Sequence, residues 1–168
     1  MDKARCLNRL ARLFYRDEQL ESHRILGDVY RSEGRKEKAI HHLGVALGIA
    51  SPSNWHDQLF WIHYSLAALF LDKREFDGAH SHVERAKSLA AEDAYNLGRA
   101  MGLLARILCR QCKFKEAKFE ALRAYETFEK LEATRDLEVC RTSLQEIERA
   151  TKSPSTRDNS NFYGELPE

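Results

Sequence analysis

Two cysteines separated by two residues form the motif in this sequence that is most typical of a chemical site. Cys109 and Cys112 have the spacing of redox-active thiols and of half a zinc site. A redox pair is expected at a helix N-terminus, but the helical pattern here places this pair at a helix C-terminus, where the dipole opposes a thiolate. No second Cys-x-x-Cys or His-x-x-x-His completes a zinc site. We therefore predict structural cysteines and no bound metal.

The seven histidines include two close pairs, His41-His42 and His80-x-His82. Adjacent positions of a helix point about 100° apart, so neither pair forms a chelating face by itself. The chain also lacks a Ser/His/Asp order, a nucleophile elbow and a glycine-rich phosphate loop. The sequence therefore predicts no enzymatic activity and no cofactor.

The elements that carry these residues are expected to be helices. The 168 residues include only 3 Pro and 8 Gly, and they are rich in Ala, Leu, Arg, Lys and Glu. The 27 basic residues nearly cancel the 26 acidic ones, which argues against binding driven by overall charge to nucleic acid or membrane. The longest apolar run, 66–71, is too short to cross a bilayer, and the charged N-terminus lacks a signal-peptide core. We expect a cytoplasmic protein with reduced cysteines and no membrane partner.

An internal repeat organises these helices. The three copies are His23-x-x-Leu26-Gly27-x-x-Tyr30 with Ala39, His63-x-x-Leu66-Ala67-x-x-Phe70 with Ala79, and Met101-x-x-Leu104-Ala105-x-x-Leu108 with Ala117. Two antiparallel helices approach closely only where side chains are small, so the small residues of the two helices in each copy are expected to face each other. Each hairpin then leaves an apolar face that only the next hairpin can bury. The pattern predicts stacked helical hairpins at about 20–53, 60–93 and 98–131, within a repeat domain at 1–150.

Both ends of the array depart from the repeat. Residues 3–16 carry apolar positions at helical spacing and are expected to form an extra N-terminal helix, either the remnant of an earlier repeat or a cap. Its apolar face is a candidate homodimer contact. Residues 135–150 have the single apolar stripe of a capping helix. Residues 151–168 are polar and helix-breaking, so we predict a disordered tail.

The first repeat resembles the tetratricopeptide family. That family's pattern, W-x-x-L-G-x-x-Y followed by A-x-x-x-F and P, is matched at Leu26, Gly27, Tyr30, Ala39 and, one position late, Pro52. It departs at His23 and Leu43, and the repeats are longer than usual. The resemblance implies a right-handed α-solenoid of about three hairpins.

Segments such as 96–101 and 120–126 further resemble tetratricopeptide arrays of mushroom-forming fungi. In that group the arrays often follow an NB-ARC-type switch domain, but no Gly-x-x-x-x-Gly-Lys-[Ser/Thr] loop occurs in this sequence.

The resemblance also implies a binding groove, because in this family the first helix of each repeat lines a concave channel. The positions that correspond to that channel are Arg24, Asp28, Arg31, Trp61, Tyr64, Ala68, Leu71, Arg99, Leu103, Arg106 and Arg110. They place aromatic and aliphatic residues between arginines. Arginine suits carboxylates and aromatic residues suit apolar side chains, so the expected ligand is an acidic-amphipathic protein or peptide segment.

Three functions are compatible with this sequence. The leading hypothesis is a protein-interaction scaffold that binds a partner in the groove. A second is single-stranded RNA binding, motivated by arginines and lysines near Trp61 and Tyr64. A third is that the chain is a truncated sensor or oligomerisation array of a larger NTPase switch protein.

Overall fold

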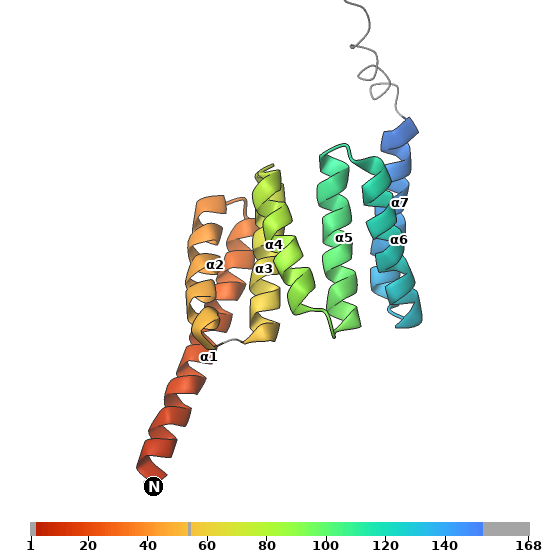
Figure 1. Ribbon diagram of the computed structural model, residues 1–168. Helices are drawn as coiled ribbons and strands as arrows, with labels where there is room; N and C mark the ends of the chain where they lie inside the picture. Colours follow the sequence, from red (N-terminus) through yellow and green to blue (C-terminus); the bar gives the residue numbers. More distant parts are fainter. Residues whose placement is uncertain (1–2, 54, 153–168) are drawn as a thin grey trace, which may run out of the picture.

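The computed structural model describes residues 3–53 and 55–152, which form an all-α protein (Figure 1). These ranges contain seven α-helices and one short 3₁₀ turn, Ser51–Ser53. The α-helices are α1 Lys3–Ser32, α2 Lys36–Ala50, α3 His56–Asp72, α4 Phe76–Leu89, α5 Ala94–Arg110, α6 Phe114–Lys130 and α7 Thr134–Lys152. The prediction of an all-α fold built from helical hairpins is confirmed.

The helices stack in the order of the chain, as Figure 1 shows. The most extensive contacts join α1 to α2, α3 to α4 and α5 to α6, so each of these pairs is a hairpin. The odd-numbered helices also touch their odd-numbered neighbours, from α1 through α3 and α5 to α7. We call these four the inner helices, because together they form one face of the stack. This layer positions the candidate site.

Four of the turns between helices have the same backbone conformation and hydrogen bonds. After α1, Arg35 N–H donates to Tyr30 O at 2.8 Å and Gly34 N–H donates to Arg31 O at 3.0 Å, which is a Schellman cap. The same two bonds recur after α3, α5 and α6. The cap needs one residue in the left-handed region, and these residues are Gly34 (φ 73°), Arg74 (61°), Cys112 (60°) and Glu132 (53°). Only the first of them is the glycine that favours this conformation.

Small residues let the helices approach, as the repeat predicts. The alanines at the predicted contact positions are fully buried, namely Ala39, Ala67, Ala79, Ala105 and Ala117. Gly27 lies against Leu43 of α2, and a Cβ at this glycine would stand 2.5 Å from Leu43 Cγ. The two helices of the first hairpin therefore pack glycine against leucine at this point.

The core runs through the stack in three linked clusters. One joins α1, α2 and α3 around Leu43 and Ile62, and another joins α3 through α7 around Phe60 and Ile107. Phe70 and Leu89 pack against both. A third, smaller cluster joins α5, α6 and α7 around Phe128. Each hairpin thus buries its apolar face on the next, as expected for repeat proteins.

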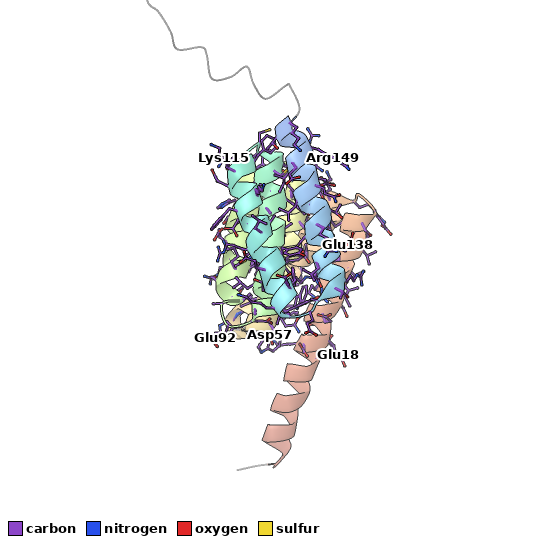
Figure 2. The ribbon with its side chains drawn as sticks, turned by 90° about the vertical axis from the view of Figure 1, so that its right-hand side faces the viewer. Glu18, Asp57, Glu92, Lys115, Glu138 and Arg149 are labelled. Carbon is purple, nitrogen blue, oxygen red and sulfur yellow. The ribbon has the colours of Figure 1, made fainter. Side chains whose placement is uncertain are left out.

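The N-terminal prediction needs one correction. Residues 3–16 are not a separate helix, because α1 runs unbroken from Lys3 to Ser32. The linking residues 17–20, Asp-Glu-Gln-Leu, contain no Gly or Pro, so nothing in them stops a helix. Figure 2 shows α1 leaving the stack near Glu18, and its N-terminal part extends beyond the other helices.

At the other end, α7 occupies the place predicted for a capping helix. Cys140 and Ile147 are buried and Leu144 packs against the core, as the apolar stripe requires. The charged side chains of Glu138 and Arg149 lie at the periphery of the stack (Figure 2). The helix continues to Lys152, and the predicted tail beyond it lies outside the described residues.

Candidate functional site

A groove lies between α5 and α7 on the layer of inner helices. It contains two adjoining hollows of about 320 Å³ and about 350 Å³. The two hollows share Ala105, Arg106, Val139 and Ser143, so they form one continuous feature, here called the α5–α7 groove. Its other functional side chains are Tyr64, Tyr95, Arg99, Arg135 and Asp136 in the first hollow, and Cys109, Arg110, Thr142 and Glu146 in the second.

Arg99 closes the groove on the side of α3. Its guanidinium lies over the Trp61 ring at 5.0 Å and over the Tyr64 ring at 5.4 Å, and these rings meet edge to face. Partial burial opposes the charge of Arg99, but Tyr64 and Tyr95 outweigh that effect and raise its pKa. The residue therefore stays charged while it is stacked between neighbouring inner helices.

A hydrogen bond extends this contact to α7. Tyr95, at the start of α5, donates from its hydroxyl to Asp136 Oδ2 of α7 at 2.9 Å. Its ring packs edge to face on Phe128. Tyr95 also contributes to the raised pKa of Arg99, so Arg99, Tyr95 and Asp136 link α3, α5 and α7, which are three of the four inner helices.

Three further arginines of the groove remain available to a ligand. Arg106 and Arg110 of α5 and Arg135 of α7 are exposed. Within the described ranges they take part in none of the ion pairs. Beside them, Val139 is 57% exposed and provides an apolar contact. Four arginines face two acids here, Asp136 and Glu146, so the groove favours an anionic partner.

The predicted site residues of α1 lie apart from this groove and are already paired. Arg24 donates to Glu21 at 2.9 Å and to Asp28 at 3.3 Å on its own helix. This pairing raises the pKa of Arg24 and lowers that of Glu21. Arg31 forms an ion pair with Asp72 of α3 at 2.9 Å. None of these side chains lines the α5–α7 groove.

Three predicted residues belong to the core. Ala68 and Leu71 are only 8% and 7% exposed, because α5 packs over this face of α3. They offer a ligand no open surface, so their assignment to a binding face is wrong. Leu103 is also buried, although it forms part of the floor of the first hollow.

The second wall of the groove comes from α7, which sequence reasoning treated only as a cap. Its contributions include Arg135, Asp136, Val139, Ser143 and Glu146. A signal was available in the spacing of the inner helices. Helices α3, α5 and α7 begin at residues 56, 94 and 134, so the steps are 38 and 40 residues, and α7 holds the place of the first helix of a fourth unit.

The cysteine motif lies where the sequence predicted, at the end of a helix. Cys109 is in the last turn of α5, and Cys112 is the left-handed residue of the cap that follows. Burial, together with the charge of Glu146, raises the pKa of the Cys109 thiol. Burial also raises the pKa of Cys140, to about 11. Both thiols are therefore poorer nucleophiles than an ordinary cysteine at neutral pH.

Histidines pair across helices rather than along them. His23 of α1 meets His42 of α2, and His63 of α3 meets His82 of α4, each with an Nδ1–Nδ1 distance of 2.9 Å. Sequence reasoning considered only neighbours along the chain and missed both pairs. In the described parts of the chain, no group of three or more His, Cys, Asp or Glu side chains is arranged to hold a metal ion.

The comparisons with known proteins bear on the fold alone. No protein-family model matches the chain, and no curated protein matches its sequence. Among solved structures, the chain is similar to BtubC (BKLC) from P. vanneervenii, with a TM-score of 0.61 and 18% sequence identity. The match covers 91% of this chain and 68% of that one. The likeness supports the helical-repeat arrangement and carries no functional assignment.

The helices of the described residues differ from membrane-spanning segments. None of them combines the length and the apolar character needed to cross a membrane.

Proposed function

We propose that this protein is a tetratricopeptide-type scaffold that binds a peptide or protein segment in the α5–α7 groove. The observation that carries the proposal is a set of exposed arginines, Arg106, Arg110 and Arg135, that form no ion pair with the described residues and lie beside the exposed Val139. A partner with carboxylates and apolar side chains in alternation complements both kinds of contact.

The tetratricopeptide assignment is supported by the register of the hairpins. Tyr30, Phe70 and Leu108 each accept the long hydrogen bond of their Schellman cap, and each stands nine residues before a buried alanine. The packing of Gly27 against Leu43 adds the close helix contact that this family uses.

Single-stranded RNA is the weaker candidate ligand. That hypothesis needs Trp61 and Tyr64 to stack on bases, but both rings are half-buried and already contact Arg99. The groove arginines alone supply charge without an open stacking surface.

A displayed library of random 20-residue peptides, selected on the immobilised full chain, tests the proposal. We expect enrichment of sequences that combine Asp or Glu with Leu, Phe or Trp. Affinity for the best synthetic peptide should fall at least tenfold in Arg106→Glu/Arg110→Glu and should weaken as salt increases.

The matched control is Arg85→Glu/Lys130→Glu, which makes the same change in charge at exposed positions of α4 and α6 that do not line the groove. It should bind like the wild type. Equal affinity in the groove variant, or no enrichment at all, would contradict the proposal. Tighter retention of a (U)20 oligonucleotide than of every selected peptide would favour the RNA hypothesis instead.

A further inference from the structure

The two histidine pairs are copies of one arrangement. The partners in each pair are 19 residues apart, their Nδ1 atoms are 2.9 Å apart, and their rings are tilted by 33° in the first pair and 34° in the second. Each pair bridges the two helices of a hairpin, α1 to α2 and α3 to α4. The same contact therefore ties together each of the first two hairpins.

An aromatic ring covers each pair from the same side. Tyr30 stacks on His42 at 5.2 Å, and Phe70 stacks on His82 at 5.3 Å with only 9° between the planes. Cations also lie over these rings, namely Arg35 and Lys38 on Tyr30, and Lys73 on Phe70. The histidines thus lie half-buried beside cations, of which Arg35 and Lys73 also form ion pairs with Glu33 and Glu75.

The third hairpin lacks this contact. The same register places Met101 on α5 and Glu120 on α6, where the other hairpins carry histidine. The protein therefore contains an internal comparison between two hairpins with a histidine pair and one without.

Protonation breaks such a pair. An Nδ1–Nδ1 hydrogen bond holds one proton between two nitrogens, so a second proton at this position leaves two donors facing each other. Burial, His23, His41 and Lys38 lower the pKa of His42. On the second pair, burial, His82 and Arg85 lower the pKa of His63 to about 4, and burial lowers that of His82. The folded hairpins therefore resist protonation.

We infer that the histidine pairs make the first two hairpins acid-sensitive, so that acidification loosens α1–α4 while α5–α7 stay packed. The unfolded histidine has a pKa of about 6.5, so the unfolded chain takes up protons first as the pH falls. The stability contributed by the neutral pairs is complete above that value and is lost as the pH falls from about 6.5 toward 4. Hairpins of a repeat protein can open separately, so the loss stays with the hairpins that carry the pairs.

Hydrogen exchange of the wild-type chain, measured by mass spectrometry at pH 7.5 and pH 5.0 and corrected for intrinsic rates, tests this inference. Amides of α2, α3 and α4 should lose protection by about tenfold or more, since one pKa unit corresponds to a factor of ten. Those of α5 and α6 should change less than twofold. Uniform loss along the chain, or no loss in α2–α4, would overturn the inference.

A variant pair gives an independent test. His42→Gln/His82→Gln keeps a hydrogen-bonding side chain at each position but cannot take up the second proton. Its α2–α4 protection should depend on pH at most a third as strongly as in the wild type. His80→Gln, an exposed histidine of α4, should behave like the wild type. If the double variant exchanges fully at pH 7.5, the wild-type measurement alone decides.

Discussion

The first hairpin and the last three helices both present arginines on the inner helices, but they use them in opposite ways. In α1, Arg24 is neutralised by Glu21 and Asp28, and Arg31 is bound to Asp72 of α3. In the α5–α7 groove, Arg106 and Arg110 have no such partner within the described residues. Identical side chains can thus stabilise the stack at one end and remain available to a ligand at the other. The difference comes from the acids nearby, not from the arginines.

The largest expected effect concerns the tight packing of the first hairpin. Gly27→Ala forces a methyl group into Leu43, whose side chain is fully buried and has little room to move. We expect a loss of about 2 kcal/mol in unfolding free energy, typical of overpacking. Urea unfolding followed by circular dichroism measures it, with Gly44→Ala, which meets nothing within 4 Å, as the control. An unchanged midpoint for Gly27→Ala would show that the hairpin tolerates a wider spacing.

The next effect comes from placing an acid beside the unpaired arginines of the α5–α7 groove, as α1 already does with Arg24. Ser143→Glu places a carboxylate on the α7 wall of the groove. Arg106 of α5 lines the same groove. An internal acid should compete with an acidic ligand and lower its affinity about tenfold, or about 1.4 kcal/mol. Ser143→Gln, which has similar size without the charge, should bind within about twofold of the wild type. Fluorescence anisotropy with a selected peptide distinguishes the two variants, and equal losses in both would indicate a steric cause.

A smaller effect compares paired and unpaired arginines directly. Arg24→Gln removes two ion pairs from partly exposed positions, so we expect it to cost about 0.5–1 kcal/mol of stability. Arg110→Gln should change stability by less than about 0.3 kcal/mol, because Arg110 takes part in no ion pair within residues 3–53 and 55–152. Thermal unfolding at low and high salt measures both, and the cost at Arg24 should shrink with salt. A larger loss at Arg110 than at Arg24 would reverse the comparison.

The smallest effect concerns the turn that positions α7. Glu132 adopts φ 53°, a conformation that favours glycine, and its side chain is exposed. Glu132→Gly should raise the unfolding free energy by about 0.5 kcal/mol, since relief of the left-handed conformation outweighs the added freedom of the unfolded chain. Differential scanning calorimetry follows the shift. At the equivalent position, Gly34→Ala should lower the unfolding free energy. If both substitutions changed the unfolding free energy in the same direction, backbone strain would be excluded as the cause.

Much of the fold was predictable because its signals are local. The spacing from Tyr30 to Ala39, Phe70 to Ala79 and Leu108 to Ala117 predicted three hairpins, and the structure contains them. The extent of α1 was not predicted, because the apolar pattern pauses between residues 16 and 20 while the helix does not. The spacing of apolar residues reveals only the parts of a helix that are buried. A part of a helix that leaves the stack has no buried stripe, but its backbone hydrogen bonds still hold it in the helical conformation.

The candidate site was predictable in part. Trp61, Tyr64, Arg99, Arg106 and Arg110 do lie on inner helices, and all of these except Trp61 line the α5–α7 groove. Trp61 instead supports Arg99 from α3. The spacing of the tetratricopeptide pattern also placed Ala68 and Leu71 in the groove, but both are buried. Spacing identifies one face of a helix and does not reveal which other helix covers that face.

The sequence by itself determined that this chain would form helices, where most of them would turn, and that small residues would bring them together in pairs. These features depend on contacts within one hairpin, and residue types record them directly. Only the tertiary structure decided which arginines are neutralised, that α7 forms a wall of the groove, and that His23 meets His42 and His63 meets His82. The physical reason is distance: ion pairs, grooves and shared protons depend on a few ångströms between different helices, and the order of residues does not specify those separations.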